Sequence, residues 1–425
     1  MKTLYTPTQK QIYIWNIVGS TLNALLSVLL LMVASLLLNN RETDIFSLAW
    51  SFGMQALTVG TFQVRLYQST DTNEKYSFNQ YFIFRIITTL AMVLYSAGYV
   101  IISGYSNYKA IIVFLICLAR TVDGFSDLFQ GWFQQKERMD LSGKALSAHS
   151  LTLLFVFAPV LFITENLMLT SILMCVGNII TFFLFDYRYF AMMKKEHKTT
   201  AAHPSKNFLI KLASASLPLF INAYIIMDIF NQPKFSIDLA IGSGLLADGS
   251  QKIYNILFLP ASVLNLIFLM FRPLITQMAV VWNKNERKEF LKIIKNISLG
   301  LLGMSVIVLI GGWFLGCPVL SFVYSTPLSD YRIVLIIAII GGLFNTFMYL
   351  MDNAITVIRC HSFLIIAYAV AWIYTILTVK FFVNNYGLLG ASICFASSML
   401  LLFICTVIIF FICMHTKRSQ NGQNN

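Results

Sequence analysis

The chain has 425 residues, of which 58% are hydrophobic and only 11% are charged, whereas a soluble domain has roughly 25% charged residues. Its mean hydropathy is +0.74, and twelve membrane-crossing helices of about 20 residues each would need about 240 residues, close to its apolar content. These figures exclude a soluble enzyme, a nucleic-acid-binding protein and a disordered chain.

Apolar runs long enough to cross a bilayer follow one another along the whole chain. They lie near 13–38, 44–64, 81–103, 108–128, 147–163, 167–190, 208–229, 253–281, 293–316, 331–352, 361–382 and 387–414. The first run is too long for the core of a secretory signal peptide, so we expect it to remain as the first span. The sequence therefore predicts an all-α polytopic membrane protein with about 12 transmembrane helices.

The net charge of +12 comes mainly from loops on one side of the predicted spans. Of the 30 Lys and Arg residues, 22 fall on that side and 6 on the other. Basic loops stay in the cytoplasm, so we expect a multi-pass membrane protein with both termini cytoplasmic. No nucleic-acid partner is needed to explain this charge.

The longest hydrophilic stretches suggest how the spans are grouped. A basic segment at 191–207 divides the chain into residues 1–190 and residues 208–425, each with six predicted spans. The sequence therefore predicts two six-helix bundles around a central cavity, joined by a basic cytoplasmic linker, as in many transporters. The second stretch, 231–252, is predicted to be a loop on the outer side.

The fourth span carries polar residues at helical spacing. They are Arg120, Asp123, Asp127, Gln130 and Gln134. Steps of three and four residues place them on one face of a helix, and Arg120 lies about 18 Å from the start of its span. Two interpretations remain open: an Arg120–Asp123 pair that only holds the bundle together, or a polar stripe along a substrate cavity.

Four arginines lie in or near predicted spans: Arg65, Arg85, Arg120 and Arg272. Guanidinium groups bind phosphate through paired hydrogen bonds, so their convergence would form a cationic cavity for an anionic, diphosphate-bearing substrate. Asp123 and Asp127 are then candidates for proton or sodium coupling, or for holding the arginines in place. The alternative for Arg65 and Arg85 is that they reach the membrane interface with their long side chains.

Other motifs point away from enzyme chemistry. The seven cysteines form no C-x-x-C pair and the five histidines have no metal-ligand spacing, so we predict no metal site. No P-loop, G-x-S-x-G or H-E-x-x-H motif occurs. The sequence therefore predicts no catalytic residue, no cofactor and no enzyme activity.

Four stretches, in chain order, share patterns with one transporter family. Residues 65–71 read R-L-Y-Q-S-T-D and include Gln68 and Asp71; residues 131–140 read G-W-F-Q-Q-K-E-R-M-D. Residues 231–237 read N-Q-P-K-F-S-I and are predicted to follow the seventh span, and residues 271–276 read F-R-P-L-I-T. Together they resemble the Wzx-type oligosaccharide flippases, the polysaccharide-transporter branch of the multidrug/oligosaccharidyl-lipid/polysaccharide (MOP) exporter superfamily.

The resemblance implies a flippase of the bacterial plasma (inner) membrane for undecaprenyl-diphosphate-linked oligosaccharide units, used in capsule, O-antigen or other surface polysaccharide biosynthesis. It implies ion-coupled alternating access, with Gln68, Asp71 and Gln130 as further polar residues of the cavity. The partners it implies are the lipid-linked oligosaccharide, a proton or sodium ion, membrane lipids and a polysaccharide polymerase. The rival interpretations are a multidrug/ion antiporter of the same superfamily and a membrane polysaccharide polymerase.

Overall fold

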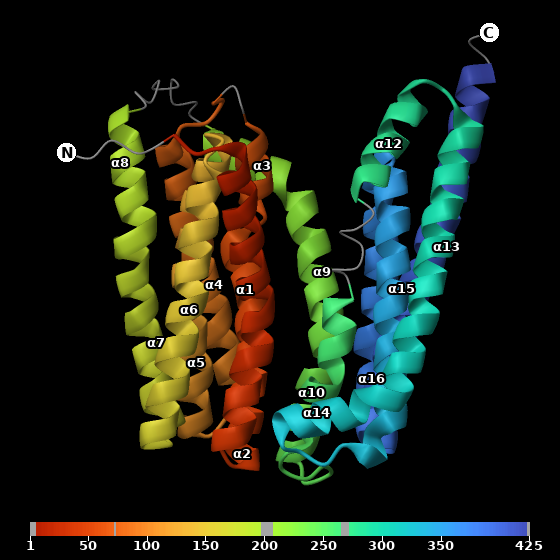
Figure 1. Ribbon diagram of the computed structural model, residues 1–425. Coiled ribbons are helices and arrows are strands. Elements are labelled where there is room, and N and C mark those ends of the chain that lie inside the picture. The colour runs from red at the N-terminus through yellow and green to blue at the C-terminus, as the bar shows by residue number, and fades with distance from the viewer. Residues whose placement is uncertain (1–5, 72–73, 197–206, 265–271, 423–425) are drawn as a thin grey trace. The chain divides into compact units, whose positions relative to one another are not determined.

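The regular structure of this chain is helical. The computed structural model describes residues 6–71, 74–196, 207–264 and 272–422, and every regular element within these ranges is a helix (Figure 1). The helices divide into two compact units, Met1–Tyr224 and Ile225–Asn425. The division falls within one long helix, α9 (Phe208–Gly242).

The N-terminal unit contains the first six predicted spans. Its elements are α1 (Gln9–Leu37), α2 (Asn40–Thr61), α3 (Val64–Thr70), α4 (Phe78–Ile102), α5 (Asn107–Gln135), α6 (Met139–Thr164), α7 (Leu167–Phe182), the π-helical turn η1 (Phe183–Tyr187), α8 (Arg188–Glu196) and the first half of α9. Residues 191–196, which the sequence assigned to the linker, continue helix α8.

The C-terminal unit follows the second half of α9. Its elements are α10 (Ser250–Val263), α12 (Arg272–Asn283), α13 (Arg287–Gly311), the π-helical turn η3 (Gly312–Gly316), α14 (Cys317–Tyr324), η4 (Ser329–Tyr331), α15 (Arg332–Val357), η5 (His361–Phe363) and α16 (Leu364–Gly422). Gly387 has φ 56° and ψ −133° within α16, a conformation that favours glycine, and this kink separates the last two predicted spans.

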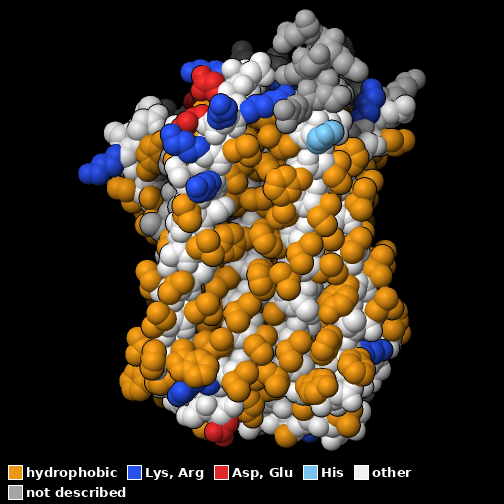
Figure 2. Space-filling view, turned by 90° about the vertical axis from the view of Figure 1, so that its right-hand side faces the viewer, with side chains coloured by type: hydrophobic (Ala, Val, Ile, Leu, Met, Phe, Trp, Pro, Cys, Tyr) orange, Lys and Arg blue, Asp and Glu red, His pale blue; other side chains and the backbone are white. Residues whose placement is uncertain are grey.

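The helices have the length and composition of membrane spans. Within the described ranges, eight helical segments are long and apolar enough to cross a membrane, or nine if the bent α2–α3 pair is one span. With α5, the helices α10 and α12 on either side of residues 265–271, and the second half of α16, the described helices are consistent with about 12 spans, which confirms the predicted fold class. Hydrophobic side chains cover most of the face in Figure 2, and charged side chains gather toward its two ends.

The sequence marks where several helices begin. Thr8 and Ser77 precede α1 and α4 and form capping boxes. The Thr8 side chain accepts a hydrogen bond from the backbone N–H of Gln11, and the Gln11 side chain accepts one from the backbone N–H of Thr8. Ser77 and Gln80 make the same pair of contacts at α4. These contacts satisfy backbone N–H groups that have no partner within the helix. The first and third predicted spans therefore begin a few residues before their apolar runs.

A break between α2 and α3 shapes the N-terminal unit. Phe62 and Gln63 both have positive φ, 47° and 54°, and the two helices meet at a bend of 46°. The carbonyl of Gly60 lies in the last turn of α2, where carbonyl groups lack helical partners. It accepts hydrogen bonds from Arg85 Nη1 at 2.6 Å and Thr88 Oγ1 at 2.7 Å. The break therefore fixes Arg85 and turns α3 toward α5.

Backbone-to-backbone contact joins α1 and α6. A Cβ added at Gly143 would lie 2.2 Å from the carbonyl oxygen of Trp15, and one at Gly19 would lie 2.5 Å from the carbonyl oxygen of Gly143. Only glycine allows helices to approach this closely, as small residues do in membrane helix pairs. Gly143 lies three residues after the second family-like stretch, and its close contact with α1 gives it a role in packing.

One prediction about the fold is wrong. Residues 231–237 were expected in a loop after the seventh span, but they lie inside α9, and the connection to α10 begins only after Gly242. The polar residues Asn231 and Gln232 and the adjacent Pro233 suggested a break. A proline can lie within a membrane helix when neighbours satisfy the freed backbone groups.

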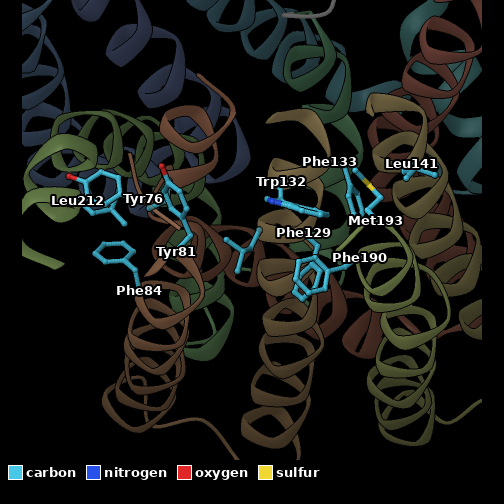
Figure 3. Packing of buried hydrophobic residues seen from close by; sticks show 12 residues of the cluster. Tyr76, Tyr81, Phe84, Phe129, Trp132, Phe133, Leu141, Phe190, Met193 and Leu212 are labelled. Atoms are coloured by element: carbon cyan, nitrogen blue, oxygen red, sulfur yellow. The ribbon is translucent and has the colours of Figure 1, made fainter. Parts of the chain in front are cut away.

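An aromatic cluster fills the α3–α8 end of the N-terminal unit. Figure 3 shows Phe129, Trp132 and Phe190 lying together between neighbouring helices. The ring centroids of Phe129 and Phe190 are 5.1 Å apart, and those of Trp132 and Phe190 are 4.9 Å apart, both in edge-to-face geometry. Such pairs add to the energy of apolar burial and hold α8 against α5.

Candidate functional site

A polar cavity lies inside the N-terminal unit. It has a volume of about 210 Å³ and is lined by residues of α1, α2, α3, α5 and α6. Its charged and ionisable lining residues are Arg65, Arg120, Asp123, Asp127 and His149, with Gln130 beside them. Four members of the predicted α5 stripe therefore face one cavity, and the fifth, Gln134, contacts Arg65 from the same face.

Asp127 joins two arginines of different exposure. Its Oδ1 lies 3.3 Å from Arg65 Nη1 and its Oδ2 lies 2.9 Å from Arg85 Nη2. The Arg85 side chain is 1% exposed and does not line the cavity, whereas the Arg65 side chain is 29% exposed and does. Of the two arginines, only Arg65 is therefore accessible to a ligand in this cavity.

Arg65 connects three helices through its guanidinium group. Besides Asp127, it donates to Gln130 Oε1 at 3.2 Å and Gln134 Oε1 at 3.4 Å on α5, and to Ser142 Oγ at 3.2 Å on α6. These partners are uncharged, so they accept hydrogen bonds without neutralising the positive charge of the Arg65 guanidinium. The arrangement holds Arg65 in place while leaving part of its charge available to an anion.

Arg120 is held by a carboxylate and an aromatic ring. Its Nη1 donates to Asp123 Oδ2 at 2.6 Å, and its guanidinium carbon lies 3.8 Å from the centroid of the Trp50 ring. Trp50 is fixed in turn by a hydrogen bond from its Nε1 to Ser27 Oγ at 2.9 Å. The expected Arg120–Asp123 pair is present, and a cation–π contact adds to it.

The pair continues into a chain of hydrogen bonds across α5, α6, α7 and η1. Asn178 Nδ2 donates to Asp123 Oδ1 at 2.8 Å, and Asn178 Oδ1 lies 2.6 Å from His149 Nδ1. His149 Nε2 lies 2.7 Å from Asp186 Oδ2, and Asp186 Oδ1 accepts from Ser126 Oγ at 2.7 Å. Gln130 donates to Ser126 Oγ at 2.8 Å, so the chain returns to the partners of Arg65.

His149 lies between two oxygen atoms, those of Asn178 and Asp186. The amide of Asn178 is oriented by its donation to Asp123 and to the carbonyl of Ala119 at 3.1 Å, so its oxygen faces His149 as an acceptor. Both ring nitrogens of His149 thus face acceptor oxygens. A neutral imidazole donates from only one nitrogen, so this arrangement matches an imidazolium that donates to Asn178 on one side and to Asp186 on the other.

The fixed charges of this network nearly cancel, and the cationic cavity expected from the sequence stays a prediction. Its fixed charges are those of Arg65, Arg85, Arg120, Asp123, Asp127 and Asp186. Three positive and three negative charges balance, because an unpaired guanidinium inside a membrane is costly. With a neutral His149 the network is therefore neutral, and with an imidazolium at His149 it carries one positive charge.

Two further predicted residues lie outside the cavity lining. Gln68 on α3 is fully buried against Gly131, where an added Cβ would lie 2.5 Å from Gln68 Oε1. Asp71 follows α3, and its carboxylate accepts from the backbone of Lys75 and Tyr76 and from Tyr81 Oη at 3.0 Å. Through these contacts, Asp71 shapes the α3–α4 connection. Burial raises the pKa of the neighbouring Tyr76 phenol above its ordinary value.

The fourth predicted arginine belongs to the other unit. Arg272 begins α12, and its side chain lies outside the described residues. Elsewhere in that unit, Asp228 accepts from Trp372 Nε1 at 2.6 Å, and Asp352 accepts from Tyr368 Oη at 2.8 Å. The structure therefore brings together Arg65, Arg85 and Arg120 and leaves the position of the Arg272 side chain a prediction.

Sequence reasoning did not select three central members of the network: His149, Asn178 and Asp186. All three are buried polar residues in predicted spans. The available signal was the presence of Asn178 and Asp186 in one span, eight residues apart. The π-helical turn η1 adds a residue to the helix and carries the fully buried Asp186, and such turns are frequent at functional sites.

No protein-family model matches the chain. A relative, the capsular polysaccharide biosynthesis protein CapF of Staphylococcus aureus, is 24% identical over 281 residues, which cover 64% of this chain and 67% of that protein. A multidrug resistance MATE family transporter of the MOP superfamily, in its inward-facing conformation, matches with a TM-score of 0.66 and 12% identity over 96% of this chain and 100% of its own.

The lipid II flippase MurJ, in an inward closed conformation, matches with a TM-score of 0.63 and 14% identity over 93% of this chain and 87% of its own. A MOP superfamily transporter from Pyrococcus furiosus matches with a TM-score of 0.58 and 12% identity over 96% of this chain and 94% of its own. The chain is thus a multi-pass membrane protein with the fold found in MOP superfamily transporters.

Proposed function

We propose that this protein is a flippase that carries undecaprenyl-diphosphate-linked oligosaccharide units across the bacterial plasma membrane. The observation that carries the proposal is the polar cavity, in which Arg65 and Arg120 lie within a membrane unit. The fold of the MOP transporters and the similarity to a capsular polysaccharide biosynthesis protein support it. The protein is a transporter rather than an enzyme, with both termini cytoplasmic, and a polysaccharide polymerase would receive the delivered units.

The two arginines that line the cavity would bind the diphosphate by exchanging partners. Arg65 is held by Asp127 and Arg120 by Asp123, so a diphosphate oxygen would compete with each carboxylate for guanidinium N–H groups. Arg85 would remain buried and continue to hold Asp127. In alternating access between the two units, this exchange would bind the headgroup on one side and release it on the other.

We propose that a proton drives the exchange, through His149 and Asp186 in addition to the predicted residues Asp123 and Asp127. The pair holds its proton between Asn178 on α7 and Ser126 on α5. Loading the proton changes the network from neutral to one positive charge, which favours an anionic headgroup. Losing it as pH rises removes that charge, and so weakens headgroup binding.

The first test measures which membrane face holds the lipid-linked oligosaccharide in cells depleted of this protein. Lipid-linked glycans are extracted, identified by mass spectrometry and probed with a membrane-impermeant glycan-modifying reagent. Cells complemented with Arg65→Ala or Arg120→Ala should accumulate complete single units on the inner face. Arg41→Ala is the matched control, because Arg41 is exposed in the first turn of α2. Full polymer output from both cavity variants at normal expression would contradict the diphosphate site.

The second test addresses coupling. In proteoliposomes with a fluorescent lipid-linked oligosaccharide, His149→Gln should flatten the pH dependence of flipping, because glutamine can donate to Asp186 but cannot carry the proton. His361→Gln is the control, since His361 is exposed in η5. An unchanged pH profile in His149→Gln would assign the coupling to other groups.

One observation favours a second candidate, a multidrug/ion antiporter. Asp123 and Asp127 line the cavity together with the arginines, and carboxylates suit the cationic substrates of such antiporters. Export of cationic dyes by the reconstituted protein, without flipping of lipid-linked glycans, would support this candidate. Normal delivery of single units with loss of polymerisation alone would instead indicate a polymerase.

A further inference from the structure

An aromatic groove lies on the outside of the N-terminal unit, separate from the polar cavity. It has a volume of about 460 Å³, which is within the range of about 300–1,000 Å³ typical of ligand sites. Its lining includes Phe78 and Phe82 of α4, Phe125 and Phe129 of α5, Tyr187 of η1 and Phe190 of α8. The polar cavity and the groove therefore lie on different sides of α5.

The floor of the groove is rigid and its edge is open. Phe129 and Phe190 are 3% and 9% exposed and belong to the packed aromatic cluster of Figure 3. Ile179, Phe183 and Tyr187 form the edge on α7 and η1 and are 46%, 57% and 50% exposed. A groove with a packed floor and an open apolar edge suits a hydrocarbon chain.

One end of the groove is cationic. Lys194 lies at that end, in the last turns of α8, with its Nζ 5.7 Å from the centroid of the Phe190 ring, and Asn79 of α4 also lines the groove. The helix from Ile179 to Lys194 rises about 22 Å. This is half of the roughly 40–45 Å thickness of a bilayer with its headgroups.

We propose that the groove binds one anionic phospholipid, with an acyl chain along the phenylalanines and the phosphate at Lys194. The length of the groove fits a lipid of a single leaflet, and basic pockets between membrane helices are known to select anionic headgroups. The edge of the groove includes η1, which also carries Asp186 of the polar network. A bound lipid would therefore hold the turn that positions Asp186.

The test is lipid retention by the purified full-length protein, measured by native mass spectrometry after exposure to equal amounts of phosphatidylglycerol and phosphatidylcholine. The wild type should retain one phosphatidylglycerol in preference. Lys194→Glu should lower the retained fraction at least about five-fold, the effect of one basic residue near an anionic headgroup. Lys10→Glu is the matched control, because Lys10 is also exposed near a helix end of this unit, and it should retain phosphatidylglycerol like the wild type.

A second variant tests the apolar part of the site. Ile179→Trp places a larger side chain at the exposed edge of the groove and should also reduce retention, with the protein still monodisperse. Equal retention of both lipids by the wild type, or unchanged retention in both groove variants, would overturn the proposal. The same retention assay with polyprenyl diphosphate in place of phosphatidylcholine tests the headgroup. A preference for polyprenyl diphosphate over phosphatidylglycerol would overturn the proposal as well. So would a change of oligomeric state in Ile179→Trp. Because retention is measured without transport, a failure here is distinct from a failure of the flippase proposal.

Discussion

Removing the charge of Asp127 should destabilise the N-terminal unit through the buried Arg85. The Asp127–Arg85 contact is 2.9 Å long, and the Arg85 side chain is 1% exposed. Leaving a buried charge without its partner costs about 3–5 kcal/mol. Asp127→Asn keeps an amide oxygen as acceptor and Asp127 is itself 21% exposed, so we expect the lower end, about 3 kcal/mol. The contact with the more exposed Arg65 adds less than about 1 kcal/mol.

Thermal unfolding of the purified protein in detergent, followed by tryptophan fluorescence, measures this effect. For a unit of this size about 3 kcal/mol corresponds to a fall in Tm of about 6–12 °C. Glu289→Gln is the control, because it removes the same charge from an exposed pair with Lys292, with side chains 45% and 64% exposed. A Tm for Asp127→Asn no lower than that of the control would refute the reasoning.

A double substitution separates an unpaired charge from a lost contact. In Arg85→Met with Asp127→Leu, both charges are replaced by apolar side chains, which is often neutral for buried ion pairs. Thr88 Oγ1 still donates to the carbonyl of Gly60 at 2.7 Å, so that group keeps a partner. The double variant should therefore be more stable than Asp127→Asn alone.

Two glycines give further predictions. Gly143→Ala would place a Cβ 2.2 Å from the Trp15 carbonyl, so we expect α1 to be displaced at a cost of about 1–3 kcal/mol, seen as a lower Tm; an unchanged Tm would contradict the close helix contact. Gly387→Ala would place an alanine at φ 56° and ψ −133°, a conformation that only glycine adopts readily, and should cost about 1–3 kcal/mol. Gly303→Ala in α13, with open space around it, should not lower the Tm, because alanine favours a helix more than glycine does. Equal Tm values for Gly387→Ala and Gly303→Ala would contradict the prediction that the kink at Gly387 requires glycine.

The hydropathy of the chain predicts its spans well, because a membrane helix must be predominantly apolar. What it misses are the places where helices continue beyond the apolar run or break within it. Residues 231–237 stay in α9 despite their polar composition. Phe62 and Gln63 break a helix although neither is a glycine or proline, because Arg85 and Thr88, distant in sequence, satisfy the carbonyl that the break exposes.

The sequence predicted which residues of the candidate site share one face of α5, but it did not predict which residues of other helices contact them. Spacing alone placed Arg120, Asp123 and Asp127 on one face of α5, and the structure places all three on one cavity. Their partners required tertiary contacts. His149 and Asp186 meet because α6 and η1 pack beside each other, and no periodicity in either segment predicts a hydrogen bond between residues 37 positions apart.

The polar residues of the first two family-like stretches fall into two physical classes. Some hold connections: Asp71 closes the turn before α4, and Arg138 and Asp140 form a two-bond pair at the start of α6, with distances of 2.8 and 3.1 Å. Arg65 differs, because it combines partial exposure with acceptors on two helices. A residue that only closed a turn would tolerate any side chain that preserves the turn. Arg65→Lys keeps the charge but loses the paired geometry, so flipping by this variant separates recognition of the diphosphate from support of the fold.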